Sequence, residues 1–258
     1  MRRLFTIITA ALAVGLAAGA AEAGQKVKIG TEGAYPPFNS IDKDGKLVGF
    51  DVDIAKAVCA AAEFECEFVV QDWDGIIPGL IAKKYDAIVA SMSITEERKQ
   101  KVDFTDKYYN TPAKFVARKG ADLKITIDGL KGKVVAVQRA TIHENFLRDN
   151  FGDVVTVNSY ATQDEAYLDL VSGRADAGIA DSVAIMDGFL STDQGKDFQF
   201  YGPDFNDPKW FGEGVGIAVR KGDNELREKL NAAIRQIRSD GTYKKINAKY
   251  FDFDVYGK

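Results

Sequence analysis

The 258-residue sequence contains little histidine and cysteine and has no excess of positive charge. One His and two Cys cannot form a His/Cys zinc site, and no cluster of Asp and Glu at loop spacing suggests a carboxylate metal site. With 34 Lys+Arg against 38 Asp+Glu, the net charge of -4 does not suit a protein that neutralises phosphates. We therefore expect no metal, no other cofactor and no nucleic-acid partner.

A long hydrophobic run occurs only at the N-terminus. Residues 1–3 form a short basic start, residues 4–20 are apolar apart from two Thr, and Ala21, Glu22 and Ala23 place small residues where signal peptidase reads them. This pattern predicts a secretory signal peptide over residues 1–23, cleaved after about Ala23. A membrane anchor is the alternative, but the run has only about 17 residues and no basic stop follows it.

The two cysteines, Cys59 and Cys66, have six residues between them. In an exported protein they lie in an oxidising compartment, where a disulfide is the default. The disulfide would close a loop of about eight residues and stabilise the fold by about 2.5 kcal/mol in the chain-entropy model. A redox pair is the alternative, but it favours the tighter Cys-x-x-Cys spacing.

Short apolar strands alternate with amphipathic helices along most of the remaining chain, and this alternation predicts an α/β fold. The first series has predicted strands at 27–30, 66–70 and 86–90 and helices at 52–63 and 76–83. The second has strands at 133–137, 154–158 and 176–180 and helices at 142–150, 163–172 and 183–190. Two further helices are predicted at 225–239 and 243–250.

The two series contain similar segments. At an offset of 90 residues, DGIIPGLIAKKYDAIVAS at 74–91 matches DEAYLDLVSGRADAGIAD at 164–181 with five identities in 18 positions. Any two helix–strand units can show such overlap, but here helix meets helix and strand meets strand, which favours a repeated unit. We infer two similar lobes that face a ligand with the carboxyl ends of their strands.

Polar residues follow the predicted strand at 86–90. Ser91 and Ser93 come directly after it, and Ser93-x-x-Glu96 predicts a capping box that opens a helix carrying Arg98. The free N–H groups of a helix start bind a carboxylate, and Arg98 can add a bidentate contact. The alternative is that Ser93 only caps the helix and Arg98 pairs with a surface glutamate.

In the second series, Thr141-x-x-Glu144 predicts another capping box shortly after the strand at 133–137. Both lobes are thus expected to direct backbone N–H groups at the ligand. The alternative is again a purely structural cap.

Acidic and aromatic residues follow other strands. Asp181 takes the place in the second copy of the repeat that Ser91 takes in the first, and a carboxylate there suits an ammonium group. Glu32 lies beside Tyr35 in GTEGAYPPF, and Trp73 follows the strand at 66–70. Two aromatic rings and an acid can form a slot for a cation. Core packing of the rings is the alternative.

Together these motifs resemble the periplasmic solute-binding proteins of ABC importers for cationic amino acids, the lysine/arginine/ornithine/histidine and octopine/nopaline-binding family. The resemblance covers residues 26–258. It is carried by GTEGAYPPF at 30–38, GFDVDIAKAVC at 49–59, WDGIIPGL at 73–80, YDAIVASMSITEER at 85–98, VQRATIHENF at 137–146, GRADAGIAD at 173–181, FGEGVGIAVRKGD at 211–223 and DGTYKKINAKYF at 240–251.

The resemblance implies the type II periplasmic solute-binding protein fold, in which two Rossmann-like lobes are joined by two hinge strands. Lobe 1 is expected at residues 24–110 and 210–258, and lobe 2 at residues 111–209. The crossings are expected near residues 109–111 and 207–210.

By the same resemblance, the ligand α-carboxylate would bind Arg98 and the backbone N–H groups of Ser93 and of the segment at Thr141 and Ile142. The α-ammonium would bind Asp181, Ser91 and Ser93.

The rest of the site, by resemblance, reads the ligand side chain. Tyr35 and Trp73 would enclose its stem, Glu32 would take its terminal charge, and Gln138 and His143 would line the far end. The sequence departs from many relatives, which carry Asp in place of Glu32, Phe in place of Trp73 and Gly in place of Ala140. These departures and the charge of His143 bear on which head group is preferred.

The function implied is a monomeric periplasmic protein that captures L-arginine, ornithine, lysine or histidine and delivers it to an inner-membrane ABC permease complex. No catalytic residue is expected. An arginine-derived opine is an alternative ligand, and a receptor-docking sensor is an alternative role. An exported enzyme resembling cyclohexadienyl dehydratase is a further alternative, with Glu32 or His143 as its only candidate acid or base. The sequence has no G-x-S-x-G elbow.

Overall fold

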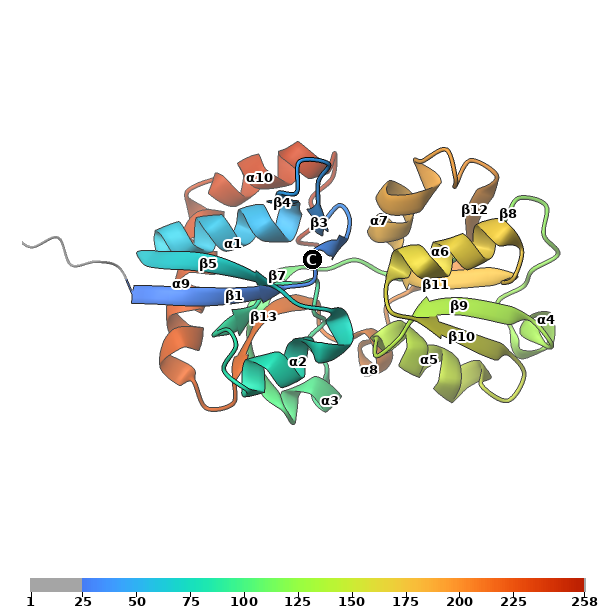
Figure 1. Cartoon of the computed structure of the whole chain (residues 1–258), viewed down its shortest axis with the longest axis horizontal. Helices are drawn as coiled ribbons and strands as arrows, with labels where there is room; N and C mark the ends of the chain where they lie inside the picture. The colour runs from blue at the N-terminus through green and yellow to red at the C-terminus, as the bar shows by residue number, and fades with distance from the viewer. Residues whose placement is uncertain (1–24, 258) are drawn as a thin grey trace, which may run out of the picture.

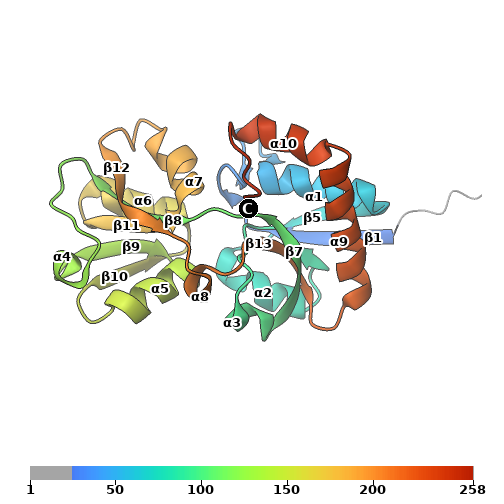
Figure 2. The same cartoon turned by 180° about the vertical axis from the view of Figure 1, so that it is seen from behind.

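The computed structural model describes residues 25–257, so the predicted signal peptide lies outside the described residues. Two lobes lie side by side, and two segments of chain pass between them (Figures 1 and 2). Each lobe contains a five-stranded sheet, with the strand orders β5-β1-β6-β13-β7 and β10-β9-β11-β8-β12. The predicted two-lobed α/β fold is confirmed.

The first lobe takes strands from both ends of the described chain. Its sheet consists of β1 (Gln25–Thr31), β5 (Phe64–Val70), β6 (Ala87–Ile88), β7 (Val102–Tyr109) and β13 (Val215–Arg220). The late strand β13 lies between β6 and β7 and is antiparallel to both. A small sheet that the sequence did not predict lies beside it, formed by β2 (Ala34–Tyr35), β3 (Asn39–Ile41) and β4 (Leu47–Val48).

Helices cover both faces of this sheet (Figures 1 and 2). They are α1 (Phe50–Ala61), α2 (Trp73–Ile81), α3 (Glu96–Lys99), α9 (Asn224–Ser239) and α10 (Thr242–Tyr250). In α1 the buried side chains of Phe50, Ile54 and Val58 recur at helical spacing and pack into the same core as α9. No helix within residues 25–257 is both long enough and apolar enough to span a bilayer.

Helix α1 begins two residues earlier than predicted, because Gly49 turns the chain just before it. Gly49 has a φ of 128°, and a Cβ atom there would lie 2.2 Å from the backbone oxygen of Phe38. Only glycine fits this approach.

The second lobe repeats the architecture of the first. Its strands are β8 (Ala113–Arg118), β9 (Val134–Gln138), β10 (Thr156–Tyr160), β11 (Ala177–Asp181) and β12 (Phe198–Phe205). Its helices are α4 (Ile127–Leu130), α5 (Ile142–Phe151), α6 (Gln163–Ser172), α7 (Ser182–Ile185), the π-helix η1 (Met186–Leu190) and α8 (Pro208–Phe211). The predicted helix at 183–190 is therefore divided between α7 and η1.

The repeat at an offset of 90 residues corresponds to equivalent units of the two sheets. In each sheet three parallel strands are followed by an antiparallel one, β13 in the first lobe and β8 in the second. The matched segments are α2 with β6 and α6 with β11, and both strands are third in their sheets. The similarity thus reflects a shared topology.

The chain crosses between the lobes twice. It passes from β7, which ends at Tyr109, to β8, which begins at Ala113, and returns between β12 and β13. Trp210 and Phe211 on the return segment pack against the core of the second lobe. We propose that the first boundary lies near residue 110, as expected, and that the return crossing is completed after residue 211.

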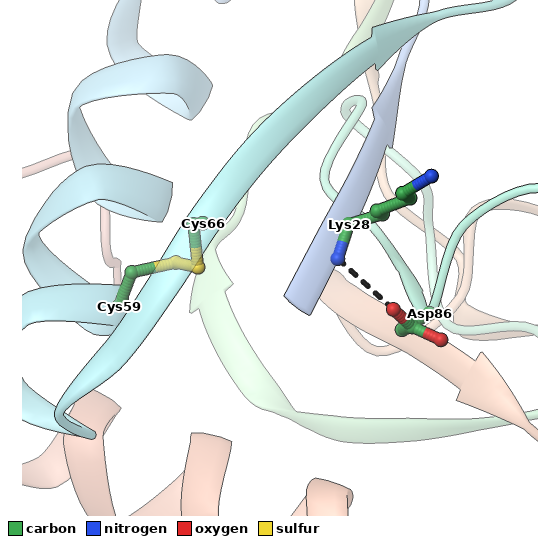
Figure 3. Close-up of a disulfide and its surroundings, with 4 residues drawn as sticks. All are labelled: Lys28, Cys59, Cys66 and Asp86. Atoms are coloured by element: carbon green, nitrogen blue, oxygen red, sulfur yellow. Dashed lines mark hydrogen bonds between the residues drawn. A yellow bond between two sulfur atoms is a disulfide. The ribbon is translucent and has the colours of Figure 1, made fainter. Parts of the chain in front are cut away.

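The two cysteines form the predicted disulfide, which joins α1 to the edge strand β5 (Figure 3). The Cα atoms of Cys59 and Cys66 are 6.1 Å apart. On the other side of β5, the backbone N–H of Lys28 in β1 donates to the Asp86 carboxylate, with an N–O distance of 2.9 Å (Figure 3). The disulfide thus fastens a helix to the edge of the sheet.

Replacing both cysteines by serine should lower the free energy of unfolding by about 2.5 kcal/mol, because the unfolded chain regains the freedom of the closed loop. Urea denaturation of the double variant and the wild type measures the difference. A thiol reductant should destabilise the wild type to a similar degree and leave the variant unchanged. Equal stability of the two proteins would contradict the assigned role.

Candidate functional site

A cavity lies between the two lobes, with a volume of about 590 Å³ that includes solvent at its mouth. All eleven residues predicted from the sequence line it: Glu32, Tyr35, Trp73, Ser91, Ser93, Arg98, Gln138, Thr141, Ile142, His143 and Asp181. Their contacts with a ligand remain predictions, but the structure brings them to one place. They come together because they follow strands whose carboxyl ends face the other lobe.

Arg98 is a buried cation without an anion. Its side chain is on α3, the residue is 9% exposed, and within residues 25–257 it forms no ion pair. Its Nη1 donates to the backbone oxygen of Ser93 at 3.0 Å, and its guanidinium carbon lies 5.2 Å from the centre of the Trp73 ring. Burial lowers the pKa of Arg98 to about 10, so the group stays charged at neutral pH. The alternative of a surface ion pair is wrong.

His143, in the first turn of α5, lies near Arg98. Burial and the positive charge of Arg98 lower the pKa of His143 to about 3. The imidazole is therefore neutral at neutral pH and can both donate and accept a hydrogen bond. The structure thus supports the neutral form of this residue.

Glu32 is a buried acid at another wall of the cavity. It is 7% exposed, and its Oε1 accepts a hydrogen bond of 2.6 Å from Gln138 Nε2 in the other lobe. Burial raises the pKa of Glu32 to about 7, and the charges of Asp164, Asp72 and Asp74 add to the rise. Ionised Glu32 is therefore costly unless a cation lies beside it.

Asp181 ends β11 and caps α7. Its Oδ1 accepts from the N–H groups of Val183 at 2.9 Å and Ala184 at 3.3 Å, and its Oδ2 accepts from the Thr111 hydroxyl. Burial raises the pKa of Asp181 to about 6 despite these hydrogen bonds. The group is ionised at neutral pH and has room for a further donor from the cavity.

The lobes are closed on one another around this cavity. Trp73 Nε1 donates to the Ala140 oxygen at 3.1 Å, and the Asp181 N–H donates to the Tyr35 hydroxyl at 3.2 Å. At the rim, Arg139 Nε lies 2.7 Å from Asp74 Oδ2. Each contact joins one lobe to the other, so the buried charges are largely shielded from water.

The predicted capping box at Ser93 is wrong. Ser93 forms a β-bridge with Val215, which keeps its backbone extended. The helix starts two residues later, where the Thr95 side chain accepts from the N–H of Arg98.

The box at Thr141 is half confirmed. The Thr141 hydroxyl accepts from the Glu144 N–H at 3.2 Å, but the Glu144 carboxylate accepts from the N–H of Ala140 and not from that of Thr141. Ala140 has a left-handed φ of 58°, and its N–H donates to that carboxylate at 2.7 Å in place of the Thr141 N–H.

Eight lining residues were not predicted from the sequence. Ala90 lies shortly after β6, and the others lie at or beside the two crossings: Tyr109, Asn110, Thr111, Ala113, Phe211, Gly214 and Val215. The expected position of the first crossing was a signal for Tyr109 to Thr111, because a segment between two lobes must pass beside the space they enclose. Thr111 acts on the site through its bond to Asp181.

The cavity therefore combines one unpaired cation, Arg98, with two separate acids, Asp181 and Glu32. This pattern complements a molecule that carries one anionic and two cationic groups.

Within residues 25–257, no group of three or more His, Cys, Asp or Glu side chains is arranged to hold a metal ion.

The raised pKa of Glu32 predicts a stability difference that depends on pH. The folded protein holds this proton up to about pH 7, whereas the unfolded chain releases it near the ordinary value of 4.5. Relative to Glu32→Gln, the ligand-free wild type should therefore lose about 3 kcal/mol of stability as pH rises through this window. Urea unfolding at several pH values measures the difference, with exposed Glu96→Gln as the control. Parallel curves for wild type and Glu32→Gln would contradict the assignment.

Comparisons with known proteins agree with the fold. The chain is 53% identical to the L-arginine-binding protein of Pseudomonas aeruginosa over 236 residues, or 91% of each chain. It is 46% identical to the histidine-binding periplasmic protein of Escherichia coli over 100% of both chains. An ancestral arginine-binding protein, solved bound to arginine, matches with a TM-score of 0.82 at 40% identity over 89% of this chain and 99% of that one. A family model matches residues 27–253, and this chain belongs to that family, the bacterial extracellular solute-binding proteins, family 3.

Proposed function

We propose that this chain is the periplasmic solute-binding component of an ABC importer and that it captures L-arginine or a related cationic amino acid, namely ornithine, lysine or histidine. The observation that carries the proposal is the charge pattern of the cavity, with one buried cation that lacks an anion and two buried acids on other walls. A basic amino acid carries the complementary three charges. The names of the relatives support the same ligand class.

In this proposal Arg98 and Asp181 bind the α-carboxylate and α-ammonium groups that all amino acids share. The α-carboxylate binds the Arg98 guanidinium, with the N–H groups of Ser93 and of the segment at Thr141 and Ile142. The α-ammonium binds Asp181, Ser91 and Ser93. The bonds from Val183 and Ala184 that fix Asp181 support its role as a preformed acceptor.

The ligand side chain lies, in this proposal, between Tyr35 and Trp73 and ends at Glu32. A cation beside Glu32 offsets the cost of ionising a buried acid. Gln138, which donates to Glu32, and neutral His143 complete the far end. By the family resemblance, many relatives carry Asp at this position, and the longer side chain of Glu32 would leave less space for the ligand stem.

The cavity favours an amino acid over an arginine-derived opine. An opine carries a second carboxylate, which would need a second cation when buried. Among the described residues that line the cavity, Arg98 is the only Arg or Lys.

We propose no catalytic role. A dehydratase needs an acid or base that is free to move a proton at the substrate. Glu32 is already bonded to Gln138 and would pair with the ligand cation, and His143 lies beside a positive charge that opposes its protonation. Close relatives named as binding proteins support the same reading.

We further propose that the protein is exported, with its signal peptide cleaved after about Ala23, and acts as a monomer. The ligand would then pass to an inner-membrane permease complex. A receptor-docking sensor would use the same cavity.

Calorimetric titration of the ligand-stripped mature protein tests the proposal. The panel consists of arginine, ornithine, lysine, histidine, octopine, nopaline and glutamate. Binding of one or more basic amino acids without binding of glutamate is expected. Binding of glutamate alone, or of no member of the panel, would refute the cationic assignment.

Replacing Arg98 by Ala or Asp181 by Asn should weaken binding of every amino-acid ligand by about 100-fold or more, because each variant leaves a ligand charge buried without its partner. Calorimetry measures the dissociation constants. Lys99→Ala is the control and should bind normally, because Lys99 is a half-buried neighbour that does not line the cavity and pairs with Glu96 and Glu213. Affinity retained in either cavity variant would contradict the proposed roles.

A further inference from the structure

A buried carboxylate lies behind the cavity and takes no part in the site described so far. Asp51, in the first turn of α1, is 0% exposed and forms no ion pair with any cation among residues 25–257. A buried charge of this kind persists only where hydrogen-bond donors surround it. The side chains that donate to Asp51 therefore indicate its structural role.

Three side chains donate to Asp51. Asn39 Nδ2 and Ser91 Oγ each lie 2.9 Å from its Oδ2, and the Tyr108 hydroxyl lies 2.7 Å from its Oδ1. Burial raises the pKa of Asp51, and the bonds from Tyr108, Asn39 and Ser91 oppose the rise. Since the Asn39 amide nitrogen can only donate, Oδ2 is an acceptor, and the ionised carboxylate satisfies all three donors at once.

This arrangement fixes the direction of the hydrogen bond that the Ser91 hydroxyl donates. A hydroxyl has one proton and two lone pairs, and the proton of Ser91 is directed at Asp51. Ser91 also lines the cavity, so its oxygen can present only lone pairs to a ligand. Its left-handed φ of 52° is uncommon for a residue with a side chain, and the bond to Asp51 helps to hold it there.

Asn39 connects Asp51 to a second part of the cavity wall, the segment at Glu32 and Gly33. The Oδ1 of Asn39 accepts from the N–H of Gly33 at 2.8 Å, next to Glu32. Tyr108 lies one residue before Tyr109, at the start of the first crossing. One carboxylate thus connects three segments that form the first lobe's side of the cavity.

We propose that Asp51 is a positioning residue that makes Ser91 an obligate acceptor toward the cavity and so selects ligands with an ammonium group at that position. The inference rests on the proposed function in taking an amino acid as the ligand. Without Asp51 the serine proton is free to turn into the cavity, where it would oppose the ammonium.

A double-mutant cycle with two ligands tests this. The variants are Asp51→Ala, Ser91→Ala and the double variant. The ligands are L-arginine and 5-guanidinopentanoate, which lacks only the α-ammonium. Asp51→Ala should weaken arginine binding about tenfold and change binding of the des-amino analogue less than about twofold. The double variant should bind arginine no more weakly than Ser91→Ala, because both changes remove the same acceptor.

Asp53→Ala is the matched control. Asp53 lies on the same helix turn but bonds to Lys249 and Tyr250, away from the cavity, so its loss should leave affinity unchanged. Equal losses for both ligands in Asp51→Ala, or single losses that multiply in the double variant, would overturn the inference.

Two outcomes call for a different comparison. If Asp51→Ala does not fold, Ser91→Ala with the same two ligands decides: a selective loss of arginine binding supports the inference, and an equal loss overturns it. If the wild type binds a neutral amino acid instead of arginine, the proposed function fails, and the cycle is run with that amino acid and its des-amino analogue.

Discussion

A charge that is buried between two closing lobes must find an opposite charge or a hydrogen-bond donor, and this constraint organises the molecule. Asp51 and Asp181 meet it largely within the protein, through side-chain and backbone donors. Arg98 and Glu32 do not meet it fully, since Arg98 has no anion among the described residues and Glu32 has one amide. A ligand can supply the opposite charges that Arg98 and Glu32 lack. Closure of the lobes without such a ligand leaves both charges buried and unpaired, so the cost of closure is also the source of selectivity.

The fold places these charges because both lobes use the same order of strands. The third strand of each sheet, β6 or β11, leads to the cavity. Ser91 lies three residues after β6, Asp181 ends β11, and both residues line the cavity. The two crossings then allow the lobes to meet, and contacts such as Trp73 with Ala140 close the walls. Neither lobe alone holds a complete site.

Much of this was predictable from the sequence because it depends on local pattern. The alternation of strands and helices predicted both sheets, and polar residues placed after strands predicted the lining of the cavity. Features set by distant residues were not predictable. The helix start at Thr95 depends on a bridge between Ser93 and Val215, more than a hundred positions away. Asp51 lies in GFDVDIAKAVC, a motif of the family resemblance, but its role was missed because its donors meet only in the folded lobe.

We propose that Glu32 recognises a positive charge at the end of the ligand side chain. Arginine and citrulline have nearly the same shape and differ in that charge, so they are to be compared by calorimetric titration of the ligand-stripped protein at about pH 8. Arginine should bind about 100-fold more tightly or better, because citrulline leaves ionised Glu32 buried without a cation. Equal affinity for the two would contradict it.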